Sequence, residues 1–108
     1  MKIDYLQMDF IHPTLKALLT WLEQETGVEY TITSIYREGD SGVHGQIPVR
    51  GIDLRIRNKA LGAHIVDLIN DNWQYDNERP GIQCAIAHGK GYSFHIHTQV
   101  HKNTMEIT

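Results

Sequence analysis

The stretch "IQCAIAHGKGYSFHIHTQVH", residues 82–101, decides how the C-terminal part of the chain folds. Both of its ends have the alternating, partly apolar composition that is typical of β-strands. A link of glycine, lysine and glycine (89–91) lies between them, and short glycine-containing links are a good signal for a β-hairpin. We therefore predict two antiparallel strands, over residues 82–88 and 92–101.

Alternation along the second strand divides its residues between two faces of the sheet. One face has Tyr92, Phe94, Ile96, Thr98 and Val100, and the other has Ser93, His95, His97, Gln99 and His101. The first face is mainly apolar and should meet the core. His95 and His97 should then be neighbours on the polar face, about 6.5 to 7 Å apart along the strand.

Two helices and two further strands are predicted before this hairpin. Leucines spaced at i, i+3, i+4 and i+7 predict an amphipathic helix over residues 12–27. Asn58 can cap a second helix that continues to residue 73. Residues 29–36 and 52–57 have the composition and alternation of strands. This order predicts an α+β domain with a mainly antiparallel sheet and both helices on one face.

The totals of the chain limit the class of protein. Its 108 residues suit one domain spanning residues 1–108. A net charge of -3 argues against binding to nucleic acid or an anionic membrane. No apolar run approaches the roughly 20 residues of a membrane span. Residues 1–10 lack the apolar centre of a signal peptide, so we expect a protein that is cytoplasmic as synthesised.

A pair of histidines two residues apart is a weak motif, because exposed histidines on a solvated sheet face have the same pattern. A metal site is favoured by Asp53, which lies on the polar face of its own strand, and by His44, which lies nine residues earlier in a glycine-rich loop. Two histidines and an aspartate are ligands that zinc accepts, and three protein ligands leave a fourth position for water. A site built from cysteines alone is excluded, since Cys84 is the only cysteine.

The sequence "TSIYREGDSGVHGQIPVRGIDLR" (33–55), followed by "HIHTQV" (95–100), resembles the zinc D-Ala-D-Ala peptidases. That family includes carboxypeptidases, dipeptidases and the L-alanyl-D-glutamate endolysins of phages, and shares its fold with the Hedgehog signalling domain. Its pattern has a strand ending in Ser-x-Tyr-Arg, a His-x-x-Gly-x-Ala-x-Asp segment and a closing strand with a histidine ligand. The match covers residues 31–99, most of the chain.

The resemblance implies a role for each matching residue. His44, Asp53 and His97 would be the zinc ligands. Arg37 would bind the substrate carbonyl or carboxylate and stabilise the oxyanion. His95 would hydrogen-bond the water or the tetrahedral intermediate, as the first histidine does in relatives that end in His-x-His.

Two polar residues complete the candidate site. We predict Ser41 and Gln99 as substrate-binding residues, together with Arg37. Gln99 could also orient a ligand imidazole, because it shares the polar face of the closing strand. Ser41 could instead be an ordinary turn residue.

The sequence departs from the family pattern at three places. His44 and Asp53 are nine residues apart rather than seven, and Gly51 replaces the usual alanine. Many members have a glutamate or aspartate three residues before the last histidine as general base, and Phe94 stands there. Either His95 takes that role or catalysis has been lost.

We therefore predict a zinc metallopeptidase that hydrolyses peptidoglycan stem peptides. The bond cleaved is open among D-Ala-D-Ala, L-Ala-D-Glu and a cross-bridge, as are oligomeric state and phage or chromosomal origin. The alternative is a non-catalytic zinc-binding domain that serves as a structural or binding module, for example in a phage particle. A protein with incidental histidines is disfavoured. Release to the cell wall by a holin or packaging in a virion would bring the protein to its substrate.

Overall fold

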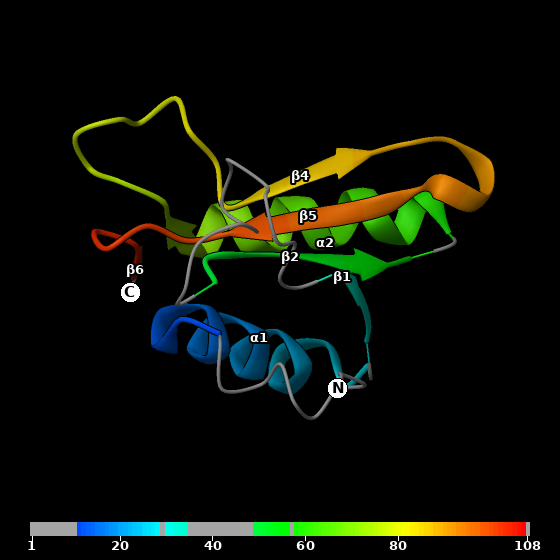
Figure 1. Ribbon diagram of the computed structural model, residues 1–108, viewed down its shortest axis with the longest axis horizontal. Helices are drawn as coiled ribbons and strands as arrows, with labels where there is room; N and C mark the ends of the chain where they lie inside the picture. Colours follow the sequence, from blue (N-terminus) through cyan, green and yellow to red (C-terminus); the bar gives the residue numbers. More distant parts are fainter. Residues whose placement is uncertain (1–10, 29, 35–48, 57, 108) are drawn as a thin grey trace.

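The computed structural model describes residues 11–28, 30–34, 49–56 and 58–107, and its arrangement is shown in Figure 1. The elements in chain order are α1 (Pro13–Thr26), β1 (Thr31–Ser34), β2 (Gly51–Arg55), α2 (Lys59–Asn72), β3 (Trp73–Gln74), β4 (Ala85–His88), the 3-10 helix η3 (Gly91–Ser93), β5 (His95–Gln99) and β6 (Met105–Glu106). The predicted α+β class is confirmed. Likeness to the Hedgehog-type fold in particular stays a prediction.

Four strands form one sheet in the order β1-β2-β5-β4. Each neighbouring pair is antiparallel. The central pair aligns Asp53 of β2 with His97 of β5, although these residues are 44 positions apart in the chain. A second sheet pairs β3 with β6, and the sequence does not predict this two-stranded sheet.

Helix α1 begins and ends at local signals that the sequence contains. The His12 side chain caps the helix by accepting a hydrogen bond from the Thr14 N–H at 3.1 Å, and Pro13 occupies the first turn. Gly27 ends the helix with a φ of 66°, a left-handed conformation that glycine adopts without steric cost. The four predicted leucines of its apolar stripe are all buried.

Helix α2 begins at its predicted cap, where the Asn58 side chain accepts a hydrogen bond from the Leu61 N–H at 3.1 Å. It packs against β4, and Figure 1 shows it behind β4 and β5. Helix α2 also lies close to Phe94, the residue before β5, because a Cβ atom on Gly62 would lie only 2.7 Å from the Phe94 ring. Among the described residues, no helix has the length and apolar content that crossing a membrane would require.

The core occupies one face of the four-stranded sheet. Leu54 is opposite Ile96 in the register, and Ile52 and Ala85 are both opposite Thr98. All five of these strand residues are fully buried. Leucines of α1 and isoleucines of α2 belong to the same cluster, so both helices cover this face. The opposite face has Asp53, His95, His97 and Gln99, as alternation predicts.

The hairpin is confirmed, but its strands are shorter than predicted. β4 begins at Ala85 and β5 at His95. The Ser93 hydroxyl donates to the Lys90 carbonyl at 2.8 Å and accepts from the Lys90 N–H at 3.1 Å, and these bonds close residues 90–93 into a turn. Ser93 is therefore a turn residue rather than a member of the polar strand face.

Candidate metal centre

Strands β2 and β5 bring together two of the three predicted zinc ligands. Asp53 and His97 are directly opposite in the antiparallel register, where side chains share a face and lie close. His97 Nδ1 lies 3.1 Å from Asp53 Oδ1. Their side chains are 15% and 13% exposed, so the pair is largely shielded yet reachable from one side.

Gln99 fixes the orientation of the His97 ring. Its amide nitrogen donates to the Gln83 carbonyl at 2.9 Å, which leaves the amide oxygen facing His97. His97 Nε2 lies 3.1 Å from that oxygen and must donate to it, since a carbonyl oxygen only accepts. Nδ1 faces an oxygen of the Asp53 carboxylate, which also only accepts, so their 3.1 Å contact needs either a proton on Nδ1, as in a hydrogen bond, or a metal ion bound by both atoms. Gln99, predicted as a substrate-binding residue, contacts His97 and Gln83 here.

His95 presents a basic nitrogen next to the Asp53–His97 pair. Its Nδ1 lies 2.7 Å from the Ser93 carbonyl and must carry the hydrogen. In the neutral ring, Nε2 is then an acceptor, and it lies 4.0 Å from Asp53 Oδ1. The His95 side chain is 32% exposed, more than twice the exposure of its two neighbours. This arrangement suits a group that exchanges protons with a bound water.

His88 is a fourth member of the cluster that sequence reasoning missed. Alternation with Ile82 and Ile86 predicts a structural role for it. In the hairpin, however, it pairs with His95, and the two rings are stacked with centroids 5.7 Å apart. The centroid of its ring also lies 6.3 Å from the centroid of the His97 ring, with the two rings in an edge-to-face arrangement. The register of the hairpin would have revealed this position, but that register depends on a turn that the sequence does not specify.

The donors of Asp53 and His97 fit a zinc ion. Zinc binds carboxylate oxygen and imidazole nitrogen at about 2.0 to 2.2 Å, so two such ligands in a tetrahedron lie about 3.3 to 3.5 Å apart. The observed 3.1 Å is within a few tenths of an ångström of that separation. A ligand histidine usually donates its other N–H to an acceptor, as His97 does to Gln99.

The remaining predicted site residues, Arg37, Ser41 and His44, lie outside the described residues. Within the part of the chain that the structure describes, no group of three histidine, cysteine or acidic side chains is arranged to hold a metal ion. The described part of the candidate centre therefore consists of two possible ligands, Asp53 and His97, with His88 and His95 beside them.

Two nearby residues can be assigned to the core. Phe94 is only 9% exposed, and its ring lies against Gly62 of α2, on the apolar side of the sheet. It therefore cannot act in place of a carboxylate base. Cys84 is fully buried, and burial raises the pKa of its thiol to about 12, so it stays protonated and is a poor metal ligand.

The chain was compared with protein-family models, with curated proteins and with solved structures, and none of the three comparisons gave a match. The resemblance to the zinc D-Ala-D-Ala peptidases therefore depends on the sequence motifs alone.

Proposed function

We propose that this protein is a zinc-dependent peptidase that hydrolyses a peptide bond in peptidoglycan stem peptides. The observation that supports it most is the approach of Asp53 Oδ1 and His97 Nδ1 to 3.1 Å at facing positions of β2 and β5. The sequence resemblance names these two residues as ligands and adds His44 as the third.

The residues have separate tasks in this proposal. Asp53 and His97 hold the ion, and Gln99 keeps the His97 ring in place through its amide oxygen. Bound zinc supplies Lewis acidity toward the substrate carbonyl and acidifies water. Arg37, by resemblance, faces the negative charge that develops on oxygen, where one fixed donor is worth roughly 2.7 to 4 kcal/mol.

His95 is the proton acceptor. The Ser93 carbonyl holds the hydrogen on Nδ1, so Nε2 offers its lone pair on the side of Asp53. Histidine is the side chain that enzymes use most often for general acid–base catalysis. His95 thereby takes the task that a carboxylate has in many relatives.

A specific observation favours a second candidate, a zinc-binding module without catalysis. The position of the usual carboxylate base is occupied by Phe94, whose ring is buried against α2. If His95 does not replace that base, the domain binds zinc and serves as a structural or binding part, for example of a phage particle.

Metal analysis tests the site. Protein purified without a histidine tag should contain about one zinc per chain, and Asp53→Ala or His97→Ala should lose it. His64→Ala is the matched control, because His64 is exposed on α2 and should leave the zinc content unchanged. Substoichiometric metal that His97→Ala does not alter would remove both zinc candidates.

Peptidoglycan digestion separates the two candidates. The zinc-loaded protein, incubated with purified peptidoglycan, should release new amino termini. His95→Ala should keep its zinc and lose roughly 10²- to 10⁴-fold in rate, the usual contribution of a general base. Zinc binding without any new amino termini would favour the non-catalytic module.

A further inference from the structure

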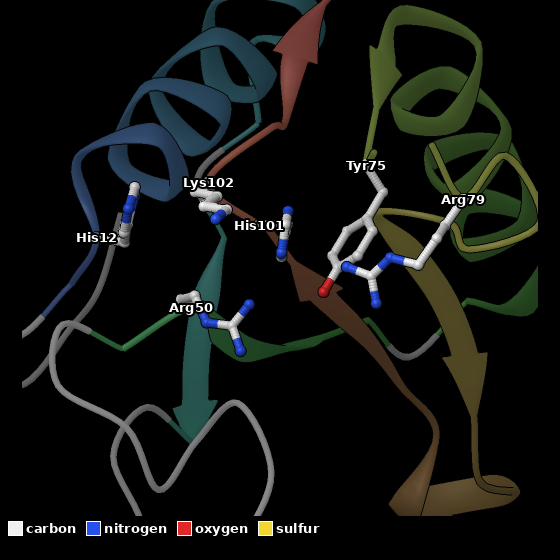
Figure 2. A pocket seen from close by; sticks show the side chains of 6 residues that line it. All are labelled: His12, Arg50, Tyr75, Arg79, His101 and Lys102. Carbon is white, nitrogen blue, oxygen red and sulfur yellow. The ribbon is translucent and has the colours of Figure 1, made fainter. Parts of the chain in front are cut away.

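A second polar pocket lies at the end of the sheet, where β2 begins and β5 ends. It has a volume of about 440 Å³. Its lining comes from segments that are distant in sequence, and consists of His12, Arg50, Tyr75, Arg79, His101 and Lys102. Figure 2 shows that the Arg50, His101, Tyr75 and Arg79 side chains extend toward one central space. None of these residues belongs to the candidate metal centre.

The lining is strongly basic. Arg50, Arg79 and Lys102 are permanent cations at neutral pH, in a chain whose net charge is -3. Among the described residues, Asp76 is a carboxylate that contacts the lining; it is 2% exposed and bonded to the Arg79 Nε at 2.8 Å. The lining therefore brings two guanidinium groups and one ammonium group together, and a guanidinium that already has a partner, as Arg79 has in Asp76, keeps further N–H donors.

Both histidines of the lining are oriented as hydrogen-bond donors. His12 Nδ1 accepts from the Thr14 N–H at 3.1 Å, and His101 Nδ1 accepts from the Asn103 N–H at 3.2 Å. His101 Nδ1 also lies 3.6 Å from a carboxylate oxygen of Asp76, beyond hydrogen-bonding distance. Each neutral ring therefore carries its hydrogen on Nε2, so each offers one N–H donor.

The cations are held in place before any ligand arrives. The Arg79 guanidinium uses Nε for Asp76 and lies over the Tyr75 ring, 5.7 Å from its centroid. Arg50 Nη1 lies 3.4 Å from the Val100 carbonyl, a long and weak hydrogen bond. Positioned guanidinium groups are well suited to carboxylates and phosphates, which accept two parallel N–H bonds.

We propose that this pocket binds an oxyanion group, the carboxylate of an acidic peptide or a phosphate. Its volume is within the range of small-ligand sites, about 300 to 1,000 Å³. His101 follows His97 by four residues and lies two residues past the end of β5, so the chain between them spans at most about 14 Å. An extended peptide bound there would place a carboxylate about four residues from the scissile bond; this part of the proposal rests on the proposed function.

The test is a ¹H–¹⁵N NMR titration of the purified protein with three probes. They are inorganic phosphate, a short glutamate-containing peptide with free carboxylates, and the same peptide with its carboxylates amidated. Saturable shifts at Arg50, Tyr75, Arg79 and Lys102 are expected with a charged probe and not with the amidated one. Binding of the peptide alone would identify carboxylate as the ligand, and binding of phosphate alone would identify phosphate and remove the link to the peptide substrate.

Matched variants assign the binding to this pocket. Lys102→Gln, a change at an exposed position, should weaken binding about two- to fivefold, and Arg50→Gln about tenfold. Lys59→Gln removes the same charge at the exposed start of α2 and should have no effect. The absence of saturable shifts, or an equal loss in Lys59→Gln, would overturn the proposal.

One further variant separates this proposal from the proposed function. Anions can also bind a zinc ion, so the titration is repeated with His97→Ala. Anion binding that persists in His97→Ala belongs to the basic pocket, whatever the outcome for the peptidase. Anion binding that disappears with His97 would belong to the metal centre and would contradict the pocket.

Discussion

The two faces of strand β5 follow different physical rules although they share one backbone. Ile96 and Thr98 are fully buried under the helices, whereas the side chains of His95 and His97 are 32% and 15% exposed on the other side. Burial of the apolar face stabilises the fold through area removed from water. The polar face contributes little of that kind, and its groups contact one another through polar bonds, such as those of His97 with Asp53 and Gln99. Substitutions on the two faces should therefore give different kinds of loss.

The largest effect on stability is expected at the apolar face. Ile96→Ala should lower the free energy of unfolding by about 2 to 5 kcal/mol, because it leaves a cavity at a fully buried position. His97→Ala in metal-free protein should lower it by less, about 1 to 2 kcal/mol, because it removes the contacts with Asp53 and Gln99 at a partly exposed position. Urea unfolding of both variants measures the difference. Equal losses would mean that the polar face also stabilises the fold.

Removal of a polar atom from the apolar face should change the free energy of unfolding by a smaller amount and in the opposite direction. The Thr98 hydroxyl is buried and finds no hydrogen-bond partner among the described residues. Thr98→Val keeps the shape and removes that group, so the free energy of unfolding should rise by about 1 kcal/mol. A lower value would show that the hydroxyl is satisfied in solution.

Thr104 provides the matched control for this substitution. Its buried hydroxyl donates to the Tyr75 carbonyl at 2.7 Å and accepts from the His101 N–H at 2.7 Å. Thr104→Val should therefore be destabilising by about 1 to 3 kcal/mol, because it leaves both backbone groups without a partner. The same unfolding measurement compares the two variants.

A pH-dependent effect is expected at Asp76, a carboxylate that is 2% exposed. The Glu78 N–H, the Arg79 guanidinium and the Asn103 amide lower its pKa from 3.8 to about 2. Since the pKa is lowered in the folded state, its contribution to stability is present above about pH 4 and is lost as the pH falls toward 2. Thermal unfolding of Asp76→Asn should show less acid-side loss than the parent protein. Asp67→Asn, at an exposed position of α2, should keep the parent profile.

Much of the fold could be predicted because its signals are local. Pro13, Gly27 and Asn58 determine where the helices begin or end through backbone geometry and capping. Alternation separates the two faces of β2 and of β5, which places Asp53 and His97 on the polar side without knowledge of their pairing. Shared faces and helix boundaries need no knowledge of distant contacts.

The hairpin register and the basic pocket could not be predicted, because they depend on contacts between residues that are distant in the sequence. The hairpin turn is closed by the Ser93 hydroxyl, and the resulting register brings His88 to the histidine cluster. The basic pocket joins His12 and Arg50 to residues more than 20 positions later. Such neighbours are set by how the elements pack, and the sequence gives no periodicity from which to infer them.

The strand order also determines when the proposed metal centre can assemble during folding. β4 and β5 are adjacent in the chain and can pair early, whereas Asp53 and His97 are 44 residues apart. Closing a longer loop costs more chain entropy, so the pairing of β2 with β5 should be a late step. A partly folded chain would have its hairpin histidines near one another without Asp53. Full metal affinity would then appear only when the sheet is complete, and its recovery on refolding would report the last stage of folding.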